Sequence, residues 1–199
     1  MKKLIAFTFL ILIGCKNFNP ENKLEVNNQV TDEDIYEIVN FVLEEHDKAM
    51  EKDGFKINPY KYILDKDLYE LFTKSDSINI FETDTIFSKE DKKYIQHQID
   101  NRKDFRFKSN FIKTKKIISS DTIYKILHEP SKYPGNNFYE RYHNKYCEGE
   151  YYSIGLPIFS KDKKTVFIKF DSFGSGYTLI YKKINNKWEY YCQFSNWIA

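Results

Sequence analysis

VFIKFDSFGSGYTLIYKKINNKWEYYCQF, residues 166–194, has the clearest strand pattern in the chain. It contains three runs of alternating apolar and polar residues, which begin at Val166, Tyr177 and Trp188. A period of two residues is typical of strands that bury one face. Gly174-Ser175-Gly176 and Asn185-Asn186-Lys187 separate the runs, and their residues tolerate positive φ. We therefore expect three half-buried antiparallel strands joined by tight hairpins.

The residues before this stretch extend the sheet and then change to helical periods. Tyr152 to Phe159 predicts another strand, which Pro157 confines to an edge or ends early. Near the other end of the chain, Thr31 and the acidic residues after it form a capping-box pattern. Apolar residues then recur at steps of three and four until Gly54, which predicts an amphipathic helix over about Asp32–Lys52.

Further helices are expected in the middle of the chain. Ser88 and Asp91 form an N-cap pattern, and an apolar stripe follows them, so a second helix is predicted up to about Arg102. The segment Ser120 to Leu127 fits a helical face as well as an edge strand. A short helix from Asp65 to Phe72 is a weaker expectation.

The order of these elements predicts an α+β fold. Helices come first and the strands follow, so we expect one domain over residues 31–199 with N-terminal helices packed on one face of a C-terminal antiparallel β-meander. The helical part is expected to reach about residue 132, and the β-meander to span about 138–198.

The first residues predict a secretory signal. Met1-Lys2-Lys3 precedes an apolar run from Leu4 to Ile13, and Gly14 and Cys15 follow. These are the charged, apolar and cleavage regions of a signal peptide. The run has about half the ~20 residues that a helix needs to cross a bilayer, so residues 1–14 are not expected to be a permanent span.

Leu12-Ile13-Gly14-Cys15 resembles the bacterial lipobox. The resemblance implies cleavage after Gly14, diacylglycerol on the Cys15 thiol and acylation of the new amino terminus. Several acyl chains anchor a protein stably, whereas one chain binds reversibly. Lys16 stands where lipoproteins of an inner membrane typically carry Asp, which favours the outer membrane without indicating the leaflet. An ordinary secreted protein with a chance cysteine is the alternative.

Charge and composition limit the classes of partner. The leader contains two of the 31 Lys and Arg residues and none of the 29 Asp and Glu residues, so the mature chain is formally neutral. No basic stripe is present, so nucleic acid is not an expected partner. Residues 15–30 are rich in Asn and poor in apolar side chains, which predicts a flexible tether between membrane and domain.

Part of the chain resembles a group of uncharacterised bacterial secreted and lipoprotein domains. The resemblance rests on Leu156 to Lys163 (LPIFSKDK), Gly174 to Tyr177, Lys187-Trp188, Ser88 to Asp91 and Gln98. In that group a PIFSKD turn precedes a glycine-rich hairpin and a final tryptophan strand. The resemblance covers residues 87–197 and implies the fold but no chemistry. Relatives often place cysteines in the hairpin, and residues 173–176 contain none.

The cysteines and histidines offer few chemical sites. Cys147 and Cys192 remain after lipidation and would meet an oxidising compartment, so a disulfide between them is predicted, with a packed free thiol as the alternative. His143 stands four residues before Cys147 and would pair with it if the segment were helical, with His128 or Glu148 as an orienting group.

Metal and cofactor binding have no support in the sequence. It lacks HExxH, CxxC and paired histidines at ligand spacing, so no metal ion and no cofactor are expected. His46 stands among acidic residues on the late turns of the first helix, where charge is typical of a solvated face.

Tyrosines crowd the segment that enters the sheet. We predict that Tyr139, Tyr142, Tyr146 and Tyr151 form a partner-binding surface, because exposed tyrosine offers a large ring with a polar tip. Packing of these rings in the core is the alternative.

Together these features predict a lipid-anchored lipoprotein of the cell envelope that binds an extracytoplasmic protein or glycan without catalysis. One alternative is an envelope hydrolase with a His-centred site. Another is an immunity-type lipoprotein that occludes a second protein.

Overall fold

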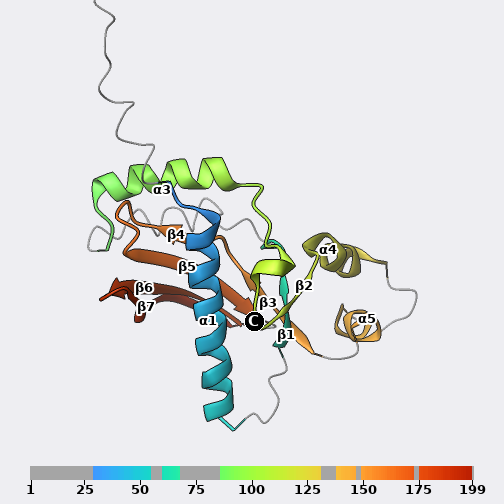
Figure 1. Ribbon diagram of the computed structural model, residues 1–199. Helices are drawn as coiled ribbons and strands as arrows, with labels where there is room; N and C mark the ends of the chain where they lie inside the picture. Colours follow the sequence, from blue (N-terminus) through green and yellow to red (C-terminus); the bar gives the residue numbers. More distant parts are fainter. Residues whose placement is uncertain are drawn as a thin grey trace, which may run out of the picture.

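The computed structural model describes residues 29–54, 60–67, 86–130, 138–146, 149–172 and 175–198, without the side chains of 194–198 (Figure 1). The helices in this part of the chain are α1 Asp32–Lys52, α3 Lys89–Arg102, α4 Ser120–His128 and α5 Phe138–Lys145, with a 3-10 turn at Ser109–Phe111. The strands are β1 Tyr60–Leu64, β2 Lys116–Ile118, β3 Glu150–Ile154, β4 Ile158–Phe159, β5 Thr165–Ser172, β6 Ser175–Ile184 and β7 Lys187–Ile198. They form one mixed sheet, so the expected α+β class is confirmed.

The meander β5-β6-β7 is antiparallel, as its alternation predicts. The β6–β7 hairpin turns at Asn185 and Asn186, whose φ angles are 50° and 62°. Positive φ at both central residues matches the twist of the flanking strands, and asparagine tolerates it. Pro157 separates β3 from the two-residue β4, so the strand expected over Tyr152 to Phe159 is interrupted there.

The sheet also contains strands that the sequence did not indicate. Its order is β2-β1-β3-β5-β6-β7, with β4 beside β5, and β1 pairs in parallel with both β2 and β3. β1 and β2 lie in the part expected to be helical, and α5 begins where the meander was expected to begin. Both strands are short, with five and three residues, so neither is long enough to give a clear alternation.

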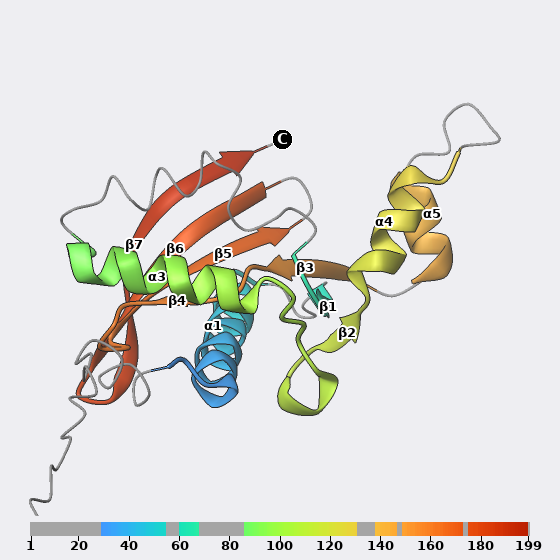
Figure 2. The same ribbon diagram turned by 90° about the horizontal axis from the view of Figure 1, so that it is seen from above.

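The helices cover both faces of the sheet, so the expectation of a single covered face is wrong. The apolar face of α1 packs on Val166 and Ile168 of β5, whereas Ile95 of α3 packs with Phe167 on the other side. Figure 1 shows α1 crossing the strands, and Figure 2 shows α3 lying over them. The difference arises because β5 is apolar at successive positions and therefore buries both faces.

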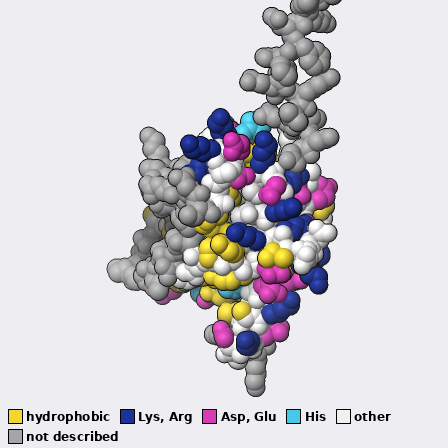
Figure 3. All heavy atoms as spheres, turned by 90° about the vertical axis from the view of Figure 1, so that its left-hand side faces the viewer, with side chains coloured by type: hydrophobic (Ala, Val, Ile, Leu, Met, Phe, Trp, Pro, Cys, Tyr) yellow, Lys and Arg dark blue, Asp and Glu magenta, His cyan; other side chains and the backbone are white. Residues whose placement is uncertain are grey.

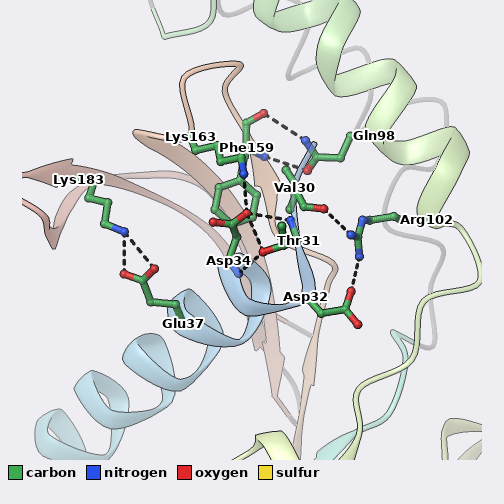
Figure 4. Close-up of polar contacts among 10 residues, drawn as sticks. All are labelled: Val30, Thr31, Asp32, Asp34, Glu37, Gln98, Arg102, Phe159, Lys163 and Lys183. Carbon is green, nitrogen blue, oxygen red and sulfur yellow. Dashed lines mark hydrogen bonds and ion pairs between the residues drawn. The ribbon is translucent and has the colours of Figure 1, made fainter. Parts of the chain in front are cut away.

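The first turn of α1 is capped as predicted. The Thr31 side chain accepts a hydrogen bond from the Asp34 backbone N–H, and the Asp34 carboxylate accepts one from the Thr31 backbone N–H. Lys163, in the β4–β5 turn, donates to the same carboxylate at 2.8 Å (Figure 4). The cap therefore fixes the start of α1 against the sheet as well as closing the helix.

α3 ties the same end of α1 to β4. Arg102 donates to the Asp32 carboxylate at 2.9 Å and to the Val30 carbonyl (Figure 4). Gln98 is buried and exchanges two hydrogen bonds with the Phe159 backbone, at 3.1 and 3.3 Å. These contacts set the direction in which α1 crosses the sheet.

A separate layer lies at the β1–β2 end. Figure 2 shows α4 and α5 side by side there, away from β6 and β7. The segment Ser120 to Leu127, ambiguous in sequence, is helix α4. The helix considered over Asp65 to Phe72 falls largely outside the described residues, and its first three residues are not helical.

Strand β7 departs from strict alternation at two register shifts. Tyr181 pairs with Tyr190 but Ile180 pairs with Cys192, so Tyr191 is an extra residue, as in a β-bulge. Trp188 therefore faces the α1 side, whereas Cys192 packs with Ile180 on the α3 side. The expectation that Trp188, Tyr190 and Cys192 share one face is wrong for the cysteine.

Candidate functional site

A row of aromatic rings crosses four adjacent strands on the α1 face of the sheet. Tyr60 of β1 stacks on Tyr152 of β3, with ring centroids 4.1 Å apart. Tyr152 contacts Phe170 of β5 at 4.4 Å, and Phe170 stacks on Tyr177 of β6 at 5.6 Å. His46 of α1 covers this row, nearly parallel to Phe170 at 4.5 Å.

Both ring nitrogens of His46 contact tyrosine hydroxyls. Nε2 makes a short hydrogen bond with the Tyr177 hydroxyl, and Nδ1 lies 3.4 Å from the Tyr152 hydroxyl. Burial lowers the pKa of His46 below 6.5, and the nearby Lys115 ammonium lowers it further against the opposing effect of Asp47. The imidazole is therefore neutral at neutral pH, with one nitrogen able to donate and the other to accept.

A buried ion pair lies beside this histidine. Lys115, whose side chain is 4% exposed, places its ammonium 2.5 Å from Asp47 Oδ1. The same ammonium lies 5.9 Å from the centre of the Tyr152 ring. The pair joins the late turns of α1 to the segment that leads into β2.

An open groove of about 590 Å³ lies between α1 and strands β6 and β7, with His46 in its lining. We call it the aromatic groove. Its lining includes Phe41, Glu45, His46, Tyr177, Tyr181, Tyr190 and Gln193. Figure 3 shows the face on the left-hand side of Figure 1, where hydrophobic side chains are exposed among both acidic and basic ones. The volume is within the range of small-molecule sites, which are mostly apolar with a few placed polar groups.

Tyr181 contacts an aromatic ring from each side of the groove. Its ring meets Phe41 of α1 edge-on at 5.7 Å and Tyr190 of β7 at 6.0 Å. Tyr181 is buried, whereas Tyr190 is 58% exposed. The β-bulge matters here, because it keeps Tyr190 and Gln193 on the α1 side although Cys192 points the other way.

The hydroxyls of the groove stay protonated. Burial raises the pKa of Tyr177 to about 12. Burial and then the Glu45 carboxylate raise the pKa of Tyr181. Each hydroxyl can therefore donate and accept a hydrogen bond at any physiological pH.

The described lining of the groove contains two carboxylates, Glu45 of α1 and Glu189 of β7. The Glu45 carboxylate lies 2.8 Å from the Lys48 ammonium on the same helix. The described lining contains neither Lys nor Arg. An anionic ligand would therefore find no counter-charge in it.

Of the four tyrosines predicted to form a binding surface, two are buried in the core. Tyr142 is fully buried and Tyr151 is 9% exposed, and both belong to the core between α4, α5 and the sheet. Tyr146 packs partly buried against that core, whereas Tyr139 is 47% exposed. The prediction is corrected for Tyr142 and Tyr151, because the apolar face of α5 turns Tyr142 inward and Tyr151 of β3 packs in the same core.

Other predicted sites lie beyond the described residues. Cys15 and Cys147 are outside them, so lipidation and the disulfide stay predictions, and Cys192 is partly buried on the α3 side. Glu148 is outside them too. His143 is exposed on α5, and His128 contacts Tyr124 of its own helix, α4.

The prediction of a solvated face for His46, which rested on its acidic neighbours, is also wrong. His46 stands four residues after Val42 and seven after Val39, both buried, and this spacing puts it on the sheet-facing side of α1. That periodicity was the available signal.

Within the described residues, no three His, Cys, Asp or Glu side chains are placed to hold a metal ion. No helix in that part of the chain has the length and apolarity to span a membrane. Comparisons of the chain with protein-family models, curated proteins and solved structures found no match.

Proposed function

We propose that this chain is a lipid-anchored lipoprotein of the cell envelope whose domain binds an extracytoplasmic ligand, a glycan or a protein segment, in the aromatic groove. The observation that carries the proposal is the groove itself. Exposed and half-buried rings line an open space of about 590 Å³, and a few polar groups stand among them. Apolar surface exposed in this way is characteristic of an interaction site.

The position of the groove on the fold also supports binding. Its walls come from α1, β6 and β7, so regular elements hold the rings in place. β7 is an edge strand, which leaves Tyr190 open to solvent. A ligand can reach the rings without displacing the core.

A His-centred hydrolase receives less support from the same geometry. The hydrogen bonds of His46 among the described residues go to two tyrosine hydroxyls, Tyr177 and Tyr152. A general base of the usual type is oriented by a carboxylate and faces a nucleophile. The arrangement around His46 instead fixes the rings of the groove.

The anchor is tested by comparing the full chain with its Cys15→Ala variant in cell fractions and by intact mass. We expect wild type in the membrane fraction with the mass of the cleaved, acylated chain, and the variant uncleaved and without lipid. Wild type without lipid mass would contradict the anchor.

The groove is tested by photo-crosslinking in intact cells. A photoreactive phenylalanine analogue replaces Tyr190 in one variant and Tyr124 of α4 in the control, because the two residues are similarly exposed, at 58% and 56%. We expect discrete adducts to an envelope component from position 190 and none of these from position 124. Identical adducts at both positions, or no adduct at 190, would exclude the groove as the binding site.

A further inference from the structure

We propose that the aromatic groove binds a neutral saccharide chain. This inference rests on the proposed function and names the class of its ligand. The first argument is the exposed ring of Tyr190 beside Tyr181 and Phe41. A sugar ring presents C–H groups on its face and hydroxyls on its rim, so it stacks on an aromatic ring while its hydroxyls reach past the edge.

The polar groups of the groove suit a ligand that both donates and accepts hydrogen bonds. Gln193 offers an amide with both functions, and Glu45 offers a carboxylate that accepts. The Tyr177 hydroxyl stays protonated and is bonded to His46 Nε2, so it adds only its remaining hydrogen-bonding capacity. A polyhydroxyl ligand can satisfy this set, whereas an aliphatic ligand would leave it unpaired.

The charges of the groove favour a neutral chain over an anionic one. The described lining has two carboxylates, Glu45 and Glu189, and no Lys or Arg, so uronate and phosphate groups would meet like charge there without a counter-ion. Glu45 pairs with Lys48. The attraction for a neutral chain comes from stacking and from hydrogen bonds, including those that the carboxylates accept from sugar hydroxyls.

The shape of the groove favours a chain over a single sugar. The space is open to solvent along α1 and the edge strand β7, and it is not enclosed as a pocket for one small molecule is. A chain can therefore pass over Tyr190 and continue beyond the contact.

The experiment is a binding titration of the full mature chain in detergent with four neutral probes: cellotetraose, maltotetraose, tetra-N-acetylchitotetraose and mannotetraose. Saturation-transfer NMR reports contact, and a titration of protein resonances gives the Kd. We expect at least one probe to bind and to saturate. Tetragalacturonate, the charged probe of equal length, should bind at least tenfold more weakly.

Variants locate the contact on the rings. Tyr190→Ala should raise the Kd of the bound probe at least tenfold, and Tyr190→Phe, which retains the ring, should stay within about threefold of wild type. Tyr124→Ala, on exposed α4, is the matched control and should leave the Kd unchanged. Thermal unfolding of each variant confirms that the fold is intact.

Three results would overturn the inference: no neutral probe binds, tetragalacturonate binds as tightly as the neutral probes, or Tyr190→Ala and Tyr124→Ala bind alike. The photo-crosslinking at position 190 distinguishes a failure of the saccharide inference from a failure of the proposal that the groove is a binding site. If position 190 still gives its envelope adducts while no saccharide binds, the groove remains a binding site and its ligand is a protein segment.

Discussion

Burial changes the protonation of His46 in the pH range near neutrality. Its pKa is lowered below 6.5, so the unfolded chain takes up a proton at higher pH than the folded domain does. The free energy of unfolding should therefore fall as the pH drops from about 6.5 towards the folded pKa of His46. Asp34, Asp65 and Asp91 have pKa values lowered from 3.8, so their contribution is lost only below that pH.

The prediction is checked by urea unfolding of wild type and His46→Phe between pH 7 and pH 4.5. The variant retains an aromatic ring against Phe170 and Tyr177 but has no group that can be protonated. Its free energy of unfolding should therefore change less over this pH range. His97→Phe, at an exposed position on α3, should keep the wild-type profile. A wild-type profile in His46→Phe would show that another group causes the loss.

Tyr142 and Tyr139 of α5 differ in burial, so substitutions at the two positions should differ in their effect on stability. The Tyr142 ring is fully buried and its hydroxyl donates to the Gly149 carbonyl at 3.0 Å. Tyr142→Ala should cost about 3–5 kcal/mol of unfolding free energy through the cavity, and Tyr142→Phe about 1 kcal/mol through the lost hydrogen bond. Tyr139→Ala, at a 47% exposed position, should change stability by less than about 0.5 kcal/mol.

Thermal and denaturant unfolding of the three variants measure these effects. Equal stability of Tyr142→Ala and Tyr139→Ala would place Tyr142 outside the core.

At the scale of elements, α1 is attached at both ends by charge as well as by its apolar face. Near its C-terminal end, Asp47 pairs with the buried Lys115. Asp47→Asn leaves a buried ammonium without its charge partner, so it should destabilise the domain by about 3 kcal/mol. The double variant Asp47→Leu/Lys115→Met removes both charges and should recover most of that loss.

A double-mutant cycle of Asp47→Leu, Lys115→Met and the double variant, measured by denaturant unfolding, checks this pair. If the destabilisation of the double variant equalled the sum of those of the two single variants, Asp47 and Lys115 would not be coupled.

Elements with local signals were the ones that the sequence predicted. Thr31 and Ser88 begin α1 and α3 with capping boxes, and Asn185-Asn186 forms the predicted hairpin turn. These signals act within a few residues. The pairing of β1 with β2 and β3 was missed, because parallel strands are brought together by crossovers that no local pattern records.

The candidate site was harder to predict than the fold. The composition of the tyrosine-rich segment led to the prediction of a binding surface, yet Tyr142 and Tyr151 lie in the core. The groove joins α1 to β6 and β7, more than 120 residues apart in sequence, and a β-bulge decides which side chains of β7 face it. Neither long-range contact nor a bulge can be derived from alternation alone.

At the scale of the whole molecule, the domain has two unlike ends. α4 and α5 lie at the β1–β2 end, away from β6 and β7 (Figure 2), and they close a small core there. The groove lies between α1 and strands β6 and β7.

Hydrogen–deuterium exchange of the full anchored chain, with and without the envelope fraction of its own cells, tests the binding site most directly. β7 is the edge strand of the sheet that the described residues form, so its outward amides should exchange quickly unless a ligand covers them. We predict slower exchange in Lys187–Gln193 and in the late turns of α1, with no change in α4 and α5. Protection confined to α4 and α5, with the exchange of β7 unchanged, would contradict it.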